Sequence, residues 1–293
     1  MTINHNSSPS LIKDWQTFLN GQGFASGTPD GIWGPHTTSA SQRFQQAHRL
    51  SADGIVGPAT IQAAEAAGFA MPQTAVFNPA GTLNAVFDIS HLNEYVDLAQ
   101  AKAGGMQAVF QKATQSGGAT LYHDKTYPTR RTAAKAAGLL WGAYHFGTAG
   151  DGTQQASEFL AYAQPDKDTL LVLDFERCTT TGESTMSEAE AIAFINEVKA
   201  QTGKYPGIYG GSLLKSVMQS NPQSELANCW LWIAQYSSAP QLPEGWSEYT
   251  FWQYTDGTNG PGAVPVAGVG KCDRDIFRGT AAELTAFWRS HAV

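Results

Sequence analysis

The segment Leu171-Val172-Leu173-Asp174-Phe175-Glu176 is a short apolar run that ends in two carboxylates. Its length and its aliphatic residues are typical of a buried strand, in which alternate side chains share a face. Asp174 and Glu176 are therefore expected to point the same way, with their Cα atoms roughly 6.6 Å apart and Phe175 on the opposite face. In barrels of the TIM type, the active site lies at the carboxyl ends of such strands.

Similar apolar runs occur on both sides of this segment, between residues 85 and 293. We expect strands at 85–89, 108–112, 140–146, 170–175, 207–209, 231–234, 250–254 and 273–277, and helices at 96–103, 129–137, 154–163, 187–202 and 281–290. Early strands separated by helices imply parallel β-α-β units, whereas the later strands have short connections and imply a less regular closure. The pattern predicts an α/β fold, a TIM-like barrel with incomplete helices in its second half.

The first 70 residues contain an internal repeat, because DGIWGPHT at 30–37 recurs as DGIVGPAT at 53–60. In each copy the glycine of Asp-Gly suits a tight turn, and the proline after the second glycine suits the first turn of a helix. Apolar residues recur at helical spacing around both copies, among them Leu11, Trp15, Phe18, Leu19, Ala40, Phe44, Ile61 and Ala64. We predict a small three-helix all-α domain at 1–70, a linker at 71–84 and the barrel at 85–293.

Composition excludes several classes of protein. The net charge of −7 and the absence of a basic stripe argue against a nucleic-acid partner. No apolar run is long enough to predict membrane insertion. Three cysteines are too few, and odd in number, for a disulfide framework. The first residues lack the pattern of a signal peptide, so we expect synthesis in the cytoplasm.

Carboxylates also mark the predicted strands that contain Asp88 and Asp273. If Asp88, Asp174 and Asp273 cluster, their negative charge and burial would hold a proton on Glu176. A protonated carboxyl group beside an ionised one suits cleavage of a glycosidic bond. Such a set, taken alone, would also fit a solvated loop or a magnesium or calcium site.

Side chains at other strand ends favour a sugar over a metal. The candidates for sugar binding are Tyr144, Tyr209, Trp232, Gln253 and Tyr254, although packing inside the barrel would explain each of them equally well. No pair of histidines or cysteines has zinc-like spacing, so we expect neither a metal nor a cofactor.

An ordered series of motifs resembles glycoside hydrolase family 25, the Chalaropsis-type lysozymes, over nearly all of 85–293. The motifs are DISHLN at 88–93, KAT at 112–114, GAYHF at 142–146, LDFE at 173–176, GKYPGIY at 203–209, LWIAQY at 231–236, WQY at 252–254 and DRDIF at 273–277. The doubled turn, together with Trp15, Leu19 and Gly23, resembles the peptidoglycan-binding module of wall hydrolases. In that module we expect Asp30, Trp33 and Asp53 to contribute to wall binding.

The resemblance implies an N-acetylmuramidase, or lysozyme, with a (β/α)5(β)3 barrel and no metal or cofactor. The bond cleaved would be the β-1,4 bond between N-acetylmuramic acid and N-acetylglucosamine. Glu176 would be the general acid/base, Asp174 would stabilise the 2-acetamido group, and Asp88 and Asp273 would complete the acidic cluster. The family's last strand often reads Asp-Leu-Asn, whereas this chain has Asp273-Arg274-Asp275. Which of the two aspartates faces the cleft therefore stays open.

The resemblance also implies bacterial peptidoglycan as the partner, and we expect a monomer that reaches the wall after release or delivery. A phage or prophage endolysin is the first hypothesis for its biological role. The alternatives are a muramidase toxin delivered by a secretion system, a catalytically inactive, lectin-like wall-binding protein, and a hydrolase of chitin-like polymers.

Overall fold

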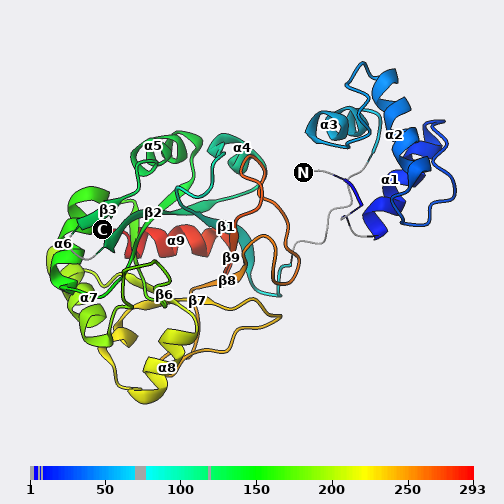
Figure 1. The fold of residues 1–293 in the computed structure, drawn as a ribbon. Helices are drawn as coiled ribbons and strands as arrows, with labels where there is room; N and C mark the ends of the chain where they lie inside the picture. The colour runs from blue at the N-terminus through cyan, green and yellow to red at the C-terminus, as the bar shows by residue number, and fades with distance from the viewer. Residues whose placement is uncertain (1–2, 6, 8, 70–76, 118–119) are drawn as a thin grey trace. The chain divides into compact units, whose positions relative to one another are not determined.

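The computed structural model describes residues 3–5, 7, 9–69, 77–117 and 120–293. The chain forms two compact units, Met1–Thr74 and Ala75–Val293, drawn in Figure 1. Part of the expected linker, 71–76, lies outside the described residues. Of the helices in the described ranges, none combines the length and the apolar character needed to cross a bilayer.

The smaller unit contains the three predicted helices, α1 (Pro9–Gly21), α2 (Pro35–Ala47) and α3 (Pro58–Ala66). Helices α2 and α3 each begin at the proline of the repeat, directly after a glycine N-cap. The glycine of each Asp-Gly pair has a positive φ, 78° at Gly31 and 76° at Gly54. Glycine adopts this conformation at no steric cost because it has no Cβ. Trp15 and Phe44 are fully buried in the core between the helices.

The larger unit is a closed barrel of eight strands. They are β1 (Leu83–Ile89), β2 (Ala108–Gly117), β4 (Leu140–Phe146), β5 (Thr169–Asp174), β6 (Gly207–Gly210), β7 (Trp230–Ala234), β8 (Phe251–Thr255) and β9 (Asp273–Phe277). Neighbours from β1 to β8 are parallel, and β9 closes the barrel antiparallel to both β8 and β1. A ninth strand, β3 (Thr120–His123), extends β2 as a hairpin. The predicted TIM-like fold is confirmed.

Helices follow the first five barrel strands in the chain. They are α4 (Leu98–Ala103), α5 (Tyr127–Ala137), α6 (Gly152–Ala163), α7 (Glu188–Thr202) and α8 (Ser212–Ser220). After α8 come a short 3-10 helix, η1 (Glu225–Asn228), and the strands β7, β8 and β9 without an α-helix between them. The last helix is α9 (Ala281–His291). The barrel thus has five β/α units and three further strands.

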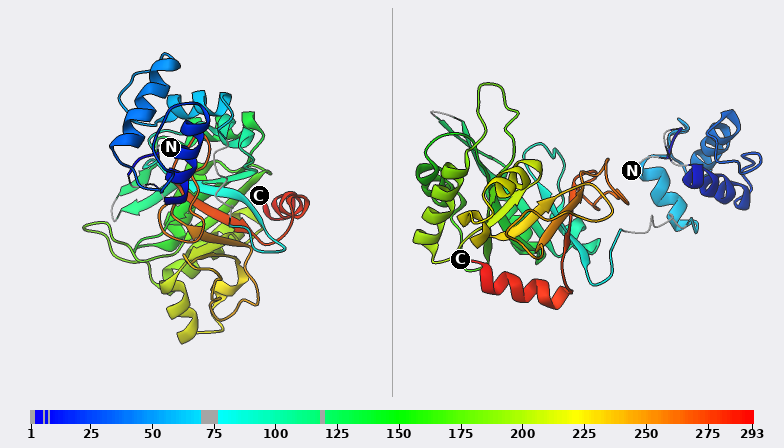
Figure 2. Two further views of the ribbon diagram at one scale, coloured as in Figure 1. Left: turned by 90° about the vertical axis from the view of Figure 1, so that its right-hand side faces the viewer. Right: turned by 90° about the horizontal axis from the view of Figure 1, so that it is seen from below.

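Alternation along the strands divides the apolar residues into two layers. Phe110 and Trp232 belong to a cluster inside the barrel, whereas Phe87 and Leu171 pack outward against the helices. Helix α9, red in Figure 2, joins the inner cluster through Trp288. The Trp288 indole donates to the carbonyl oxygens of Trp141 (3.2 Å) and Asp168 (3.1 Å), where β4 and β5 begin. Apolar packing therefore fills the amino-terminal end of the barrel and leaves its carboxyl end for polar groups.

The barrel unit begins earlier than expected. Leu83 and Asn84, assigned to the linker from sequence, lie in β1. The Asn84 amide donates to the Phe77 carbonyl (2.6 Å) and to the Tyr254 hydroxyl (2.7 Å). The Phe77 ring lies 5.6 Å from that of Trp252 between centroids. Residues 77–84 therefore pack on the barrel.

Candidate active site

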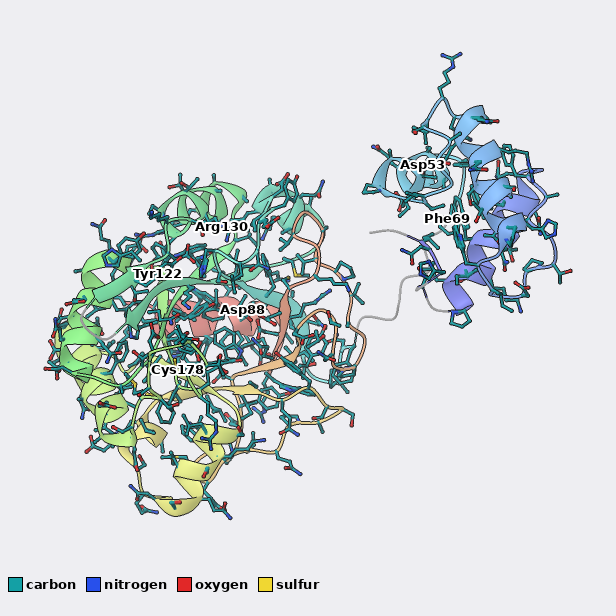
Figure 3. The ribbon with its side chains drawn as sticks, viewed as in Figure 1. Asp53, Phe69, Asp88, Tyr122, Arg130 and Cys178 are labelled. Carbon is teal, nitrogen blue, oxygen red and sulfur yellow. The ribbon has the colours of Figure 1, made fainter. Side chains whose placement is uncertain are left out.

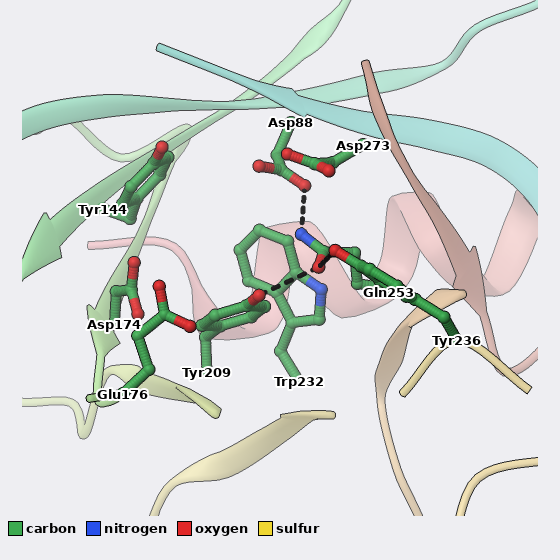
Figure 4. Close-up of a pocket in the computed structure, with 9 residues that line it drawn as sticks. All are labelled: Asp88, Tyr144, Asp174, Glu176, Tyr209, Trp232, Tyr236, Gln253 and Asp273. Atoms are coloured by element: carbon green, nitrogen blue, oxygen red, sulfur yellow. Dashed lines mark hydrogen bonds between the residues drawn. The ribbon is translucent and has the colours of Figure 1, made fainter. Parts of the chain in front are cut away.

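A pocket of about 210 Å³ opens at the carboxyl ends of the parallel strands. Nine residues from β1, β4 and β5 to β9, or from the loops directly after them, line it: Asp88, Tyr144, Asp174, Glu176, Tyr209, Trp232, Tyr236, Gln253 and Asp273. Asp174 and Glu176 lie on one side of the pocket, and Asp88 and Asp273 lie together across from them (Figure 4). The structure thus brings the four predicted carboxylates to one place. Figure 3 shows Asp88 inside the barrel unit.

Strand β5 presents two of these carboxylates. Asp174 is its last residue, and the Phe175 amide continues the pairing with β6 by donating to the Tyr209 carbonyl oxygen (2.8 Å). Phe175 is fully buried in the outer layer, so Asp174 and Glu176 both face the pocket, as predicted. One carboxylate oxygen of Asp174 is buried without a hydrogen-bond partner among the described residues. A buried, unsatisfied acceptor in a pocket is suited to a donor on a ligand.

The reversed direction of β9 places Asp273 at the pocket. Because β9 is antiparallel, its first residue lies at the end of the barrel where the parallel strands finish, and Asp273 pairs in register with Asp88. Asp275 shares the inner face of β9 but lies deeper, where it is fully buried. It accepts a hydrogen bond from the Trp232 indole (2.7 Å). Asp273, and not Asp275, lines the pocket.

Gln253 connects Asp88 to two tyrosines of the pocket. Its amide nitrogen donates to Asp88 (2.9 Å), and its oxygen accepts from the hydroxyl groups of Tyr209 (2.9 Å) and Tyr236 (3.0 Å). The Asp88 carboxylate accepts from the amide nitrogen, so the amide oxygen faces the two tyrosine hydroxyl groups. Tyr236 was not predicted as a site residue. The available signal was its aromatic side chain two residues after the end of β7.

Burial governs the protonation of the acidic cluster. It raises the pKa of Asp174, and the neighbouring Glu176 raises it further. Burial also raises the pKa of Glu176 and, together with nearby carboxylates, that of Asp88. Burial and neighbouring carboxylates raise the pKa of Asp273 to about 7. The cluster therefore retains protons near neutral pH, which a general acid requires.

The prediction for Tyr254 is wrong. It is fully buried on the outer face of β8, with its ring 5.3 Å from that of Phe77 between centroids. Gln253 occupies the inner face, and adjacent residues of a strand face opposite ways. Only one of the two can therefore reach the pocket.

In the smaller unit, a buried glutamine supports each copy of the repeated turn. The Gln16 amide nitrogen donates to Asp30 (2.9 Å), and its oxygen accepts from the Gly31 amide (2.9 Å). Gln45 makes the same bonds to Asp53 (2.9 Å) and Gly54 (2.8 Å). These contacts give both aspartates a structural role in their turns, and the sequence analysis did not identify the glutamines.

The third residue predicted for wall binding, Trp33, is half-buried. Its indole donates to the Thr38 hydroxyl (3.1 Å). Contact of Asp30, Trp33 and Asp53 with the wall stays a prediction.

Comparison with known proteins agrees with this geometry. The model of the glycosyl hydrolases family 25 matches residues 87–263, and the model of a putative peptidoglycan binding domain matches residues 8–64. Lysozyme M1 of Streptomyces globisporus is 30% identical over 228 residues, which cover 73% of this chain and 75% of the lysozyme. The N,O-diacetylmuramidase of Arthroderma benhamiae is 30% identical over 240 residues, covering 78% and 96% of the two chains.

Solved structures show the same barrel. The bacterial lysozyme from Streptomyces coelicolor has a TM-score of 0.60 and 31% identity, covering 70% of this chain and 97% of its own. A family 25 lysozyme from Aspergillus fumigatus has a TM-score of 0.58 and 30% identity, covering 72% and 99%. The chain therefore belongs to glycosyl hydrolase family 25, and it is a glycoside hydrolase with an N-terminal peptidoglycan-binding domain.

Proposed function

We propose that this enzyme hydrolyses the β-1,4 bond between N-acetylmuramic acid and N-acetylglucosamine in peptidoglycan. The observation that carries the proposal is the pairing of Asp174 and Glu176 on one side of a pocket whose other side holds Asp88 and Asp273. The relatives named lysozyme and N,O-diacetylmuramidase support this substrate class.

Glu176 acts as the general acid and base. Burial raises its pKa, so it carries a proton that it donates to the glycosidic oxygen as the bond to the anomeric carbon breaks. The oxygen of the substrate's 2-acetamido group forms the new bond to that carbon. Water then displaces the acetamido oxygen and gives its proton to Glu176, which restores the acid. Two displacements on one carbon give net retention of configuration.

Asp174 orients the acetamido group during this step. Its unpaired buried oxygen is an acceptor for the acetamido N–H, and this bond strengthens as positive charge develops on the group. Asp88 and Asp273 complete the acidic wall opposite, where Gln253 holds Asp88 in place.

Aromatic side chains provide contacts for the sugar rings. We assign this role to Tyr144, Tyr209 and Trp232, because all three line the pocket. Trp232 is held by Asp275, and its ring meets that of Tyr209 edge to face at 4.9 Å between centroids. Such a fixed aromatic surface presents apolar area to a sugar face without side-chain ordering on binding.

The reducing end of the products identifies the bond that is cleaved. Purified peptidoglycan is digested, the fragments are reduced with borohydride, and their ends are identified by mass spectrometry. We expect reduced muramic acid at the new ends. Reduced glucosamine ends would contradict the proposal, and faster release of sugar from chitin oligomers than from peptidoglycan would favour a chitin-type hydrolase instead.

We further propose that the smaller unit holds the enzyme on the wall, with Asp30, Trp33 and Asp53 near the contact, and that the whole protein serves as a phage or prophage endolysin. The support is the combination of a peptidoglycan-binding domain with a muramidase-type barrel in one chain. When the protein is expressed inside bacteria, we expect lysis only with a co-expressed holin. Lysis without a holin, or accumulation outside intact cells, would contradict the endolysin role.

A further inference from the structure

The loop that follows Glu176 is fastened at two places. On one side, the Ala149 amide donates to the Ser184 carbonyl oxygen (2.8 Å), and within the loop itself the Cys178 amide donates to the Thr185 hydroxyl (3.1 Å). On its other side, the only described side chain of a barrel strand that bonds to the loop residues 177–187 is Gln115 of β2. This contact is of interest because the loop begins directly after the proposed general acid.

Gln115 connects two groups of opposite charge. Its amide nitrogen donates to Glu183 (2.9 Å) and to the Thr180 hydroxyl (3.2 Å), both in the loop. Its amide oxygen accepts from the ammonium group of Lys112 on the same strand. An ammonium group is only a donor and a carboxylate is only an acceptor, so the amide fits in a single orientation.

Lys112 is a buried cation beside the acidic cluster. Its ammonium group lies 4.9 Å from the centre of the Phe146 ring. Within the described part of the chain, no carboxylate oxygen lies within 4.0 Å of it, so its charge is held by the neutral amide of Gln115. A buried lysine normally takes an ionised partner. Here carboxyl groups lie near the lysine but are not in contact with it.

Titratable groups from several elements surround this lysine. Those that face it are Asp174 and Glu176 at the end of β5, Asp124 after β3, Glu183 in the loop and the neutral His145 of β4. Those that face Glu176 are Asp174, Lys112, Tyr209 of β6 and Asp273 of β9. Lys112 is the cation among the groups that face Glu176, and it lowers the pKa of Glu176 against the effect of burial.

The distance between Lys112 and Glu176 has a chemical consequence. A direct ion pair would favour the ionised form of Glu176 and remove the proton that the reaction needs. A lysine too far away would leave the acidic cluster without a counter-charge.

We propose that Gln115 is a positioning residue that binds the Lys112 ammonium group and the loop after Glu176 at once, and so keeps the cation beside the catalytic carboxylates without an ion pair. The inference rests on the proposed function of Glu176. It assigns to Gln115 a role in setting the pH range of the reaction.

The test is the pH profile of kcat/KM on soluble peptidoglycan fragments for four variants. In Gln115→Leu the lysine loses its neutral acceptor and turns to the carboxylates, so the alkaline limb, where Glu176 loses its proton, moves to lower pH by about one unit or more. In Lys112→Met the same limb moves to higher pH. In the double variant the alkaline limb moves to higher pH, as in Lys112→Met, because no ammonium group is left to approach the carboxylates. Thr185→Val is the matched control, since it removes a hydrogen bond within the same loop but not the contact between Lys112 and Gln115, and we expect it to leave the limb in place.

Two results would overturn the inference: an unmoved limb in Gln115→Leu, or the same downward shift in the double variant, which would show a purely structural effect. Circular dichroism establishes that each variant is folded, and Lys112→Gln replaces Lys112→Met if the latter unfolds. The wild-type enzyme is first shown to release fragments that end in muramic acid. Failure there overturns the proposed function, whereas success with an unmoved limb in Gln115→Leu overturns the role of Gln115 alone.

Discussion

At Glu176 the barrel combines burial, which keeps the carboxyl group protonated, with access to the pocket. We expect Glu176→Gln to lower the rate of peptidoglycan hydrolysis by about 10²–10⁴-fold, because the amide cannot donate a proton to the leaving oxygen. Lysis rates measure the loss, and circular dichroism shows whether the fold is intact. Glu244→Gln, at an exposed position, is the control. Near-normal activity in a folded Glu176→Gln enzyme would refute the assignment.

The buried Asp275 is expected to make the stability of the protein depend on pH. Burial raises its pKa well above the unfolded value, so the folded protein holds a proton there that the unfolded chain releases at lower pH. The stability that the neutral form contributes is present below the unfolded pKa and is lost as pH rises toward the folded pKa, by about 1.4 kcal/mol per pH unit.

Asp275→Asn retains an acceptor for the Trp232 indole but cannot ionise. We therefore expect this variant to gain stability relative to the wild type between pH 5 and pH 8, as measured by urea unfolding at both values. Asp275→Ala removes the acceptor and is expected to be less stable than Asp275→Asn at both. An equal difference between Asp275→Asn and wild type at the two pH values would mean that Asp275 does not titrate in this way.

At the scale of elements, the repeated turns depend on their buried glutamines. Gln45→Ala leaves Asp53 and the Gly54 amide without their partner, and we expect it to destabilise α2 and α3 by about 1–3 kcal/mol. Hydrogen exchange of the amides in these two helices measures the change. Gln46→Ala, at the next and exposed position of α2, is expected to change protection little. Similar effects of the two substitutions would show that the turn does not rely on Gln45.

The sequence predicted every barrel strand, and most of them are apolar runs of strand length; β9 (DRDIF) is the exception, with only Ile276 and Phe277 apolar. It did not predict β3 or α8. Strand β3 contains polar residues and depends on its hairpin partner β2. Helix α8 does have apolar residues at helical spacing, Leu213, Leu214, Val217 and Met218, so the sequence held a signal for it that the analysis did not use. Of the two, only β3 depends on a tertiary contact that its local pattern does not encode.

For the site, the sequence predicted the four carboxylates because they coincide with strand ends. The distinction between Asp273 and Asp275 required the direction of β9, which no local pattern reveals. Likewise, the error at Tyr254 came from assigning two adjacent residues of β8, Gln253 and Tyr254, to one face. Gln253 lines the pocket, so Tyr254 faces away from it.

At the scale of the whole molecule, the two units are expected to divide binding from hydrolysis. A chain that begins at Ala75 retains the pocket, so we expect it to cleave soluble fragments at close to the full-length rate. On insoluble sacculi it is expected to be slower, because it loses the effective concentration that a wall-bound domain provides. Equal rates on sacculi would argue against wall binding by the smaller unit.

The starting residue of this truncated chain matters. A chain that begins at Asn84 also lacks Phe77, which packs against Trp252 and Tyr254. We expect it to unfold at a lower temperature than the chain from Ala75, so the longer one is the proper comparison for activity.

The pairing of β1 with β9 has a consequence for synthesis. The first and last strands of the barrel are neighbours, so the barrel cannot close until β9, nearly 200 residues after β1, has left the ribosome. Contacts between such distant segments form late and slowly. Asp88 and Asp273 are contributed by these two strands, so a nascent chain without β9 holds only part of its acidic cluster, and we expect catalytic competence only after β9 has emerged.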